Sequence, residues 1–113
     1  MTMKLINKVP DFTNDNEEWK IPLPGTDAYI EDKNSGKVLG LRQRKDCTYG
    51  SKIQIQSKGE GGFKGCAPQT NSQKWLRSDD NDWFTLKNLE TGKLLGAKSK
   101  TQFDLAGTYI IFS

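Results

Sequence analysis

The chain has 113 residues, of which 34% are hydrophobic, and it carries a formal net charge of +3 with no histidine. This length suits one domain, and so few hydrophobic residues favour a turn-rich β protein over a helical bundle. The missing histidine removes the commonest general base and metal ligand, and the slight, interspersed charge gives no basic footprint for a nucleic-acid partner.

About ten short strands are predicted in chain order, and no segment has helical periodicity of useful length. Residues 51–57 alternate strictly, which places Ile53 and Ile55 on the core face. A glycine-rich loop follows at 58–65, with Phe63 near its tip. The predicted strands and hairpins span residues 3–9, 17–23, 28–41 (a hairpin), 51–57, 73–77, 83–97 (a hairpin), 102–105 and 108–112.

Two of these segments are copies of each other. The hairpin at 28–41 aligns without gaps with residues 84–97, at a constant offset of 56. Each copy combines an alternating strand, a Ser/Thr-Gly turn and a short apolar strand closed by glycine. The chain is therefore predicted to consist of repeats. Equivalent residues at this offset are Trp19 and Trp75, Ile30 and Leu86, Gly36 and Gly92, and Leu39 and Leu95.

The two cysteines, Cys47 and Cys66, cannot form a structural zinc site without other ligands, and we expect no metal and no cofactor. They could close one disulfide loop of about twenty residues, worth roughly 3 kcal/mol in the chain-entropy model. Two buried free thiols are the alternative, with equal weight, and the cellular compartment depends on this choice. No apolar stretch reaches transmembrane length, so we expect no membrane span, and the N-terminus lacks the apolar core of a signal peptide. A mature secreted form is favoured over a cytoplasmic protein.

The order of the motifs resembles a known family. Gly-Lys-Val-Leu, Gly-Ser-Lys-Ile-Gln-Ile and Gln-Lys-Trp follow one another as in the ricin B-type lectins, whose β-trefoils carry a Q-x-W motif in each of three units. This resemblance implies a single all-β, β-trefoil-like domain over residues 1–113, with pseudo-threefold repeats. The implied units are remnants at 1–24, a full repeat at 28–78 and a further repeat at 83–113. The hairpin sequence also resembles trefoils of the fascin and fibroblast-growth-factor kind.

Within this family pattern several residues acquire structural roles. Trp19 and Trp75 would fill the core between units, and the amide of Gln73 would satisfy backbone groups of a loop. Cys66 matches the family's second cysteine, but the first has no counterpart here. A bridge in this chain would therefore have to start from Cys47.

The first unit is incomplete. It has equivalents of only a third and a fourth strand, around Leu5 and Trp19, and its capping hairpin is missing. We therefore expect either a shortened trefoil or a barrel completed by a partner subunit or a second copy. An apolar edge left uncovered by this loss would favour association.

The family's sugar pocket combines an aspartate after the hairpin, an aromatic residue after the third strand and an asparagine near the Q-x-W motif. Here Gly40 and Gly96 stand at the aspartate positions and Gln56 at the aromatic position, while Asn71 is retained. A standard pocket is therefore not expected. A modified pocket with Phe63 in the stacking role is one interpretation, and solvated loop residues are the favoured one. The candidate ligand-binding residues are Arg42, Asp46, Gln54, Gln56, Phe63 and Asn71.

The leading hypothesis is a non-catalytic carbohydrate-binding module that recognises a glycan or glycosylated surface through its loops. The alternative is a protein-interaction trefoil without sugar binding, either a subunit of a larger complex or toxin or an inhibitor acting through the loop at 58–65. We do not expect an enzyme, because histidine is absent and Asp79, Asp80 and Asp82 cluster in a predicted turn. Trp83 lies outside the repeat pattern, and core packing is favoured for it over an exposed ligand platform.

Overall fold

The computed structural model describes residues 2–5, 18–59, 62–68, 70–81, 83–97 and 102–103. Over these residues it contains β-strands and one short 3-10 helix but no α-helix, which confirms the all-β prediction. No helix in this part of the chain has the length and hydrophobicity needed to cross a membrane. The elements are β1 (Thr2–Leu5), β2 (Glu18–Lys20), β3 (Asp27–Tyr29), β4 (Glu31–Asp32), β5 (Val38–Gln43), β6 (Tyr49–Gln56), η1 (Asn71–Gln73), β7 (Lys74–Asp80), β8 (Trp83–Asn88), β9 (Leu94–Ala97) and β10 (Gln102–Phe103).

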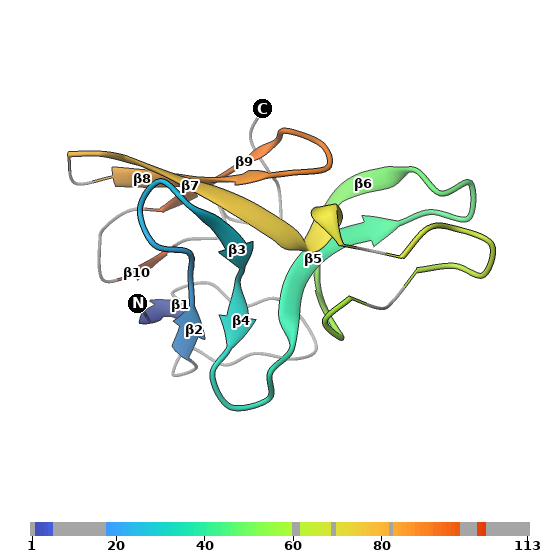
Figure 1. Ribbon diagram of the computed structural model, residues 1–113, viewed down its shortest axis with the longest axis horizontal. Coiled ribbons are helices and arrows are strands. Elements are labelled where there is room, and N and C mark those ends of the chain that lie inside the picture. The colour runs from blue at the N-terminus through green and yellow to red at the C-terminus, as the bar shows by residue number, and fades with distance from the viewer. Residues whose placement is uncertain are drawn as a thin grey trace.

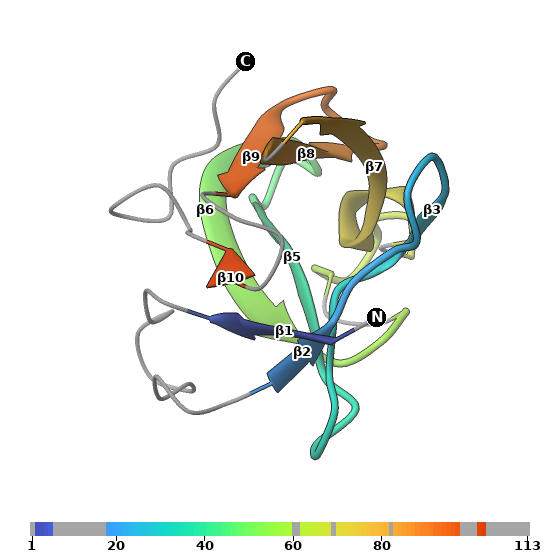
Figure 2. The ribbon, with the colours of Figure 1, turned by 90° about the vertical axis from the view of Figure 1, so that its left-hand side faces the viewer.

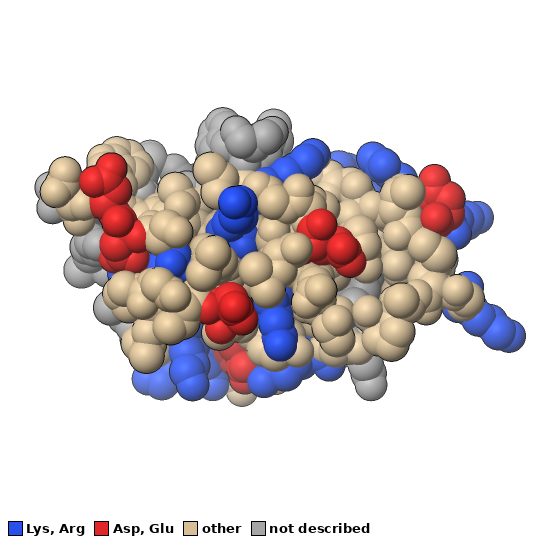
Figure 3. Space-filling view, turned by 45° about the horizontal axis from the view of Figure 1, so that its top comes forward, with Lys and Arg blue, Asp and Glu red and all other residues tan. Residues whose placement is uncertain are grey.

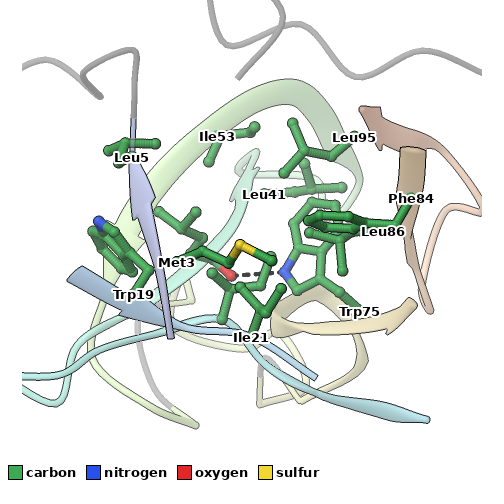
Figure 4. Packing of buried hydrophobic residues seen from close by; sticks show 12 residues of the cluster. Met3, Leu5, Trp19, Ile21, Leu41, Ile53, Trp75, Phe84, Leu86 and Leu95 are labelled. Carbon is green, nitrogen blue, oxygen red and sulfur yellow. Dashed lines mark hydrogen bonds between the residues drawn. The ribbon is translucent and has the colours of Figure 1, made fainter. Parts of the chain in front are cut away.

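The strands form two sheets (Figure 1). The larger sheet has the order β10-β1-β2-β4-β5-β6, and the smaller has the order β3-β7-β8-β9. Neighbouring strands are antiparallel, except that β1 and β10 run parallel. Seen end-on in Figure 2, strands of both sheets surround a common interior. One hydrophobic cluster fills it, with Trp19 and Leu41 from the larger sheet and Trp75 and Leu86 from the smaller (Figure 4).

The two hairpin copies keep the same turn geometry. In each, the turn glycine has a positive φ, 73° at Gly36 and 74° at Gly92, which residues with a side chain rarely adopt. The backbone hydrogen bonds around the turns also match pair by pair at the offset of 56. In the first copy the bonds run from Asp32 N to Lys37 O (2.7 Å), from Gly36 N to Asp32 O (2.9 Å) and from Lys33 N to Glu18 O (3.1 Å). In the second copy, in the same order, they run from Asn88 N to Lys93 O (2.9 Å), from Gly92 N to Asn88 O (2.8 Å) and from Leu89 N to Lys74 O (3.0 Å). The sequence repeat therefore corresponds to a repeat of the backbone.

The first hairpin differs from its copy because its leading strand is divided. β3 pairs with β7 in the smaller sheet, whereas β4 pairs with β2 and β5 in the larger sheet. Pro22 and Pro24 lie just after β2, and proline has no backbone N–H to donate to a neighbouring strand. The segment after β2 therefore does not pair with β3. The equivalent residues of the second copy are Ser78 and Asp80, and there β7 continues and pairs along the whole of β8. The expected unbroken strand at the start of 28–41 is therefore wrong.

Trp19 and Trp75 occupy equivalent places in the two copies. Each is fully buried, and each lies opposite the residue that precedes the turn, Asp32 and Asn88 respectively. Nε1 of Trp75 donates a 3.0 Å hydrogen bond to the main-chain oxygen of Leu39, drawn as a dashed line in Figure 4. Nε1 of Trp19 is buried and has no hydrogen-bond partner among the described residues. Both indoles pack in the core, but only that of Trp75 also binds the backbone of the opposite sheet.

This difference gives a matched pair of substitutions. Trp75→Phe removes the donor to the Leu39 carbonyl, whereas Trp19→Phe deletes the same atoms at an equally buried position without breaking a hydrogen bond. We expect Trp75→Phe to lower the free energy of unfolding by about 1–3 kcal/mol more than Trp19→Phe. Urea denaturation followed by far-UV circular dichroism measures both losses. Equal losses would show that the indole hydrogen bond adds nothing to stability.

Candidate functional site

The β5–β6 hairpin is interrupted by a bulge. Leu41 is paired with Ile53 and the next pair is Gln43 with Tyr49, so Arg42 alone faces residues 50–52. An unequal count of this kind breaks the ladder locally and re-aims the side chains around it. The bulge therefore opens the distal part of the hairpin.

A pocket of about 380 Å³ lies at this bulge. Its volume falls in the lower part of the range found for small-ligand sites. Phe63, from the loop after β6, contributes an aromatic ring that is 43% exposed. The remaining lining is polar or basic. The lining residues are Arg42, Gln43, Arg44, Lys45, Gly50, Ser51, Lys52 and Phe63.

Two contacts hold the loop against the hairpin, and a third closes a turn within the loop. Cys47 and Cys66 form a disulfide, which decides between the two alternatives left open by the sequence. The backbone N–H of Phe63 donates to Oε1 of the buried Gln43 at 3.0 Å, and the N–H of Cys66 donates to the carbonyl of Phe63 at 3.0 Å. A Cβ at Gly62 would lie 2.5 Å from the same Gln43 oxygen, so glycine allows the close approach. The backbone that carries Phe63 is thus tied directly to β5.

The hairpin turn is closed by local hydrogen bonds and holds Asp46 away from the pocket. Oδ1 of Asp46 accepts from the Thr48 hydroxyl at 2.6 Å and from the Thr48 N–H at 3.1 Å. These bonds, the hydroxyl bond foremost, lower the pKa of Asp46, which therefore stays ionised at neutral pH. Asp46 lies beside the pocket but does not line it. Its expected role as a ligand-binding residue is not supported by this position.

Four basic side chains surround the pocket. Among the described residues, none of Arg42, Arg44, Lys45 and Lys52 forms an ion pair within 4 Å. The ion pairs found in this part of the chain lie elsewhere and join Lys33 with Glu18, Lys58 with Glu31, and Arg77 with Asp79. In Figure 3 both signs of charge are spread over the visible face, and basic side chains reach the right-hand end, where the β5–β6 hairpin projects in Figure 1.

Two predicted ligand residues belong to a glutamine network instead. Gln56 is only 7% exposed. Its Nε2 donates to the carbonyl of Leu41 at 3.1 Å and lies 3.4 Å from Oε1 of Gln54. Its Oε1 accepts from Nε2 of Gln73 at 2.8 Å. The structure thus places the amide of Gln56 in the interior, bonded to other protein groups, and not in the pocket. Gln54 is half-buried at the edge of the network.

Gln73 holds the loop, as its position before Trp75 suggested. Its Nε2 also donates to the carbonyl of Ser57 at 3.2 Å, and its Oε1 accepts from the N–H of Gly59 at 2.7 Å. Asn71, two residues earlier in η1, is exposed but does not line the pocket. Of the six candidate ligand residues, the structure thus brings Arg42 and Phe63 together in one pocket and leaves the other four outside it.

Gly40 allows this network to form. A Cβ at Gly40 would clash with Oε1 of Gln56 and would lie 2.9 Å from Cγ of Gln73. The space beside Gly40 is therefore filled by two glutamine side chains.

We expect Gly40→Ala to lower the free energy of unfolding by about 1–3 kcal/mol, because overpacking a filled site forces side chains out of place. Gly50→Ala is the matched control in the partner strand. There the nearest atom to a new Cβ is Nη2 of Arg44 at 3.5 Å, an ordinary contact. Its effect should stay within about 0.5 kcal/mol. Chemical denaturation compares the two, and a neutral Gly40→Ala would contradict the tight packing described here.

The sequence did not identify most of the pocket lining. Gln43, Ser51 and Lys52 were missed because the bulge that turns them toward one pocket has no clear signature in the alternating pattern. The basic run at residues 42–45 was the available signal. Trp83 is 56% exposed, so the favoured interpretation of core packing for it is wrong.

No protein-family model matches the sequence, and no curated protein or solved structure matches it either. The site is therefore interpreted from its own chemistry. Within the described ranges there is no cluster of three or more histidine, cysteine, aspartate or glutamate residues that could hold a metal ion.

Proposed function

We propose that this protein is a non-catalytic carbohydrate-binding module that recognises a glycan or a glycosylated surface through the pocket at the β5–β6 bulge. The observation that carries the proposal is the position of Phe63, an exposed aromatic ring beside polar side chains on a backbone fixed by a disulfide and by Gln43. A flat ring matches the apolar face of a pyranose, and hydrogen-bonding groups beside it match its hydroxyls. Because the loop is tied down in advance, binding loses little conformational entropy.

The lining also supports binding without catalysis. Hydrolysis of a glycosidic bond usually requires two carboxylates that flank the bond. Among the described residues no carboxylate lines the pocket, and the nearby Asp46 is bonded into its own turn. The groups present can orient a sugar but offer no acid and base pair to cleave it.

We further propose a β-trefoil-like arrangement with an incomplete first unit. The matched turns and the equivalent buried tryptophans, all at the offset of 56, support a common unit. A disulfide is typical of oxidising compartments, which supports a secreted protein.

The carbohydrate proposal is tested by a glycan array with the wild-type protein and two variants. Phe63→Ala should lower the affinity for bound glycans at least about tenfold, because the stacking face is lost. Trp83→Ala is the matched control, since it removes an exposed aromatic ring from β8 in the other sheet. An array without signal at high protein concentration would refute the proposal.

A second candidate function, protein interaction without sugar binding, is favoured by Trp83 itself. Large exposed aromatic residues are enriched at protein interfaces. The same two variants separate the functions. A partner that is lost with Trp83→Ala and kept with Phe63→Ala, together with an empty array, would establish the interaction role.

We also propose that a second copy or a partner subunit completes the first unit. In the second unit the indole N–H is taken by a carbonyl of the preceding hairpin, whereas the buried N–H of Trp19 has no acceptor among the described residues. A buried donor without an acceptor costs about 1–3 kcal/mol, so this unit lacks a stabilising contact that its copy has. Sedimentation velocity should then show a concentration-dependent dimer. A strict monomer at high concentration would argue against self-association.

A further inference from the structure

We propose that the pocket at the bulge selects an acidic saccharide, one whose ring carries a sulfate, phosphate or carboxylate group, over its neutral counterpart. This inference rests on the carbohydrate-binding function proposed above and adds the chemical class of the ligand. It is carried by the charges around the pocket and by the state of its hydrogen-bond acceptors.

The charge around the pocket is only partly neutralised by the protein. Arg42 and Lys52 lie across the bulge from each other, and Arg44 and Lys45 come from the turn beside it. None of the four is in an ion pair within the described residues, although the ionised Asp46 beside the pocket interacts with Arg44. Four basic side chains and no acidic one contribute to the described lining, so the pocket presents a local excess of positive charge. Such a site attracts an anion and discriminates against a cation.

Two side-chain acceptors of the pocket already receive a hydrogen bond. Oε1 of Gln43 accepts from the N–H of Phe63 at 3.0 Å, and Oγ of Ser51 accepts from Nζ of Lys93 at 2.7 Å. The arginine and lysine side chains of the lining only donate. Sulfate, phosphate and carboxylate oxygens only accept, and they match these donors, whereas each hydroxyl of a neutral sugar brings a donor as well.

Arginine adds geometric selectivity. Its planar guanidinium donates two parallel hydrogen bonds to a carboxylate or to two oxygens of a sulfate, which lysine cannot do. Arg42 stands at the bulge and lines the pocket together with Phe63. We therefore assign the anionic group to the neighbourhood of Arg42 and Lys52, with the sugar ring against Phe63.

A nucleic acid would also satisfy basic donors, but the site favours a small ligand. The pocket is confined to about 380 Å³ and contains one aromatic ring, whereas single-stranded nucleic acid binds along a basic groove with several stacking residues. We therefore argue for the saccharide and treat nucleic-acid binding as an outcome of the test.

The test compares matched oligosaccharides that differ only in one acidic group. Isothermal titration calorimetry with N-acetyllactosamine, its 6-O-sulfated form and its sialylated form should show at least one acidic form binding at least about tenfold more tightly than the neutral parent. This preference should shrink as sodium chloride is raised from about 50 to about 500 mM, because salt screens exposed charges. A short single-stranded DNA is titrated in parallel.

The variants locate the effect. Arg42→Gln and Lys52→Gln should each lower the affinity for the preferred acidic form about tenfold and bring it near that of the neutral sugar. Arg42→Lys keeps the charge but loses the planar guanidinium with its two parallel hydrogen bonds. Its loss of affinity should therefore be smaller than that of Arg42→Gln. Lys87→Gln, at an exposed position of β8 in the other sheet, is the control and should bind as the wild type does. Circular dichroism confirms that each variant is folded.

The outcomes distinguish this inference from the function on which it rests. Equal affinity for acidic and neutral sugars would overturn the acidic preference and leave the carbohydrate-binding function standing. No binding to either form, repeated on a broad glycan array, would overturn both. Tighter binding of DNA than of any acidic sugar would replace the saccharide by a nucleic acid.

Discussion

The hydrogen bond from the indole of Trp75 to the backbone of Leu39 joins the two sheets across the core. Trp75 lies on β7 of the smaller sheet, and Leu39 lies on β5 of the larger one. Dispersion contacts alone would leave several relative positions of two small sheets with similar energy, whereas a directed bond between buried groups selects one. β5 is thereby fixed at its centre, and its distal end projects from the core as the hairpin that carries the pocket.

The residue two positions before Trp75 extends this constraint to the loop. The indole of Trp75 enters the core, while the side chain of Gln73 packs beside Gly40 of β5. There it binds both Gln56 and the backbone of the loop after β6. One short motif therefore fixes the strand and the start of the loop together. The disulfide and Gln43 fix the end of the loop, and the pocket lies between these attachments.

What the sequence predicted well was local and repeated. The Ser/Thr-Gly turns were recognised because positive φ at glycine has a clear chemical cause, and the tryptophans because they recur at the same offset. The division of β3 from β4 was not predicted, although the sequence contains Pro22 and Pro24, because it depends on which neighbouring strand is available for pairing. Gln56 was misassigned for a related reason. An alternating pattern tells which face a residue occupies but not whether a later segment covers that face.

The location of the candidate site follows from the same packing. Gln56 and Gln73 fill the space next to Gly40. Gln73 also secures the start of the loop that carries Phe63, through its bonds to Ser57 and Gly59. The pocket lies beyond this covered region, where long basic side chains can keep their charged ends in water. Packing in one half of the hairpin thus determines both the position and the charge of the site in the other half.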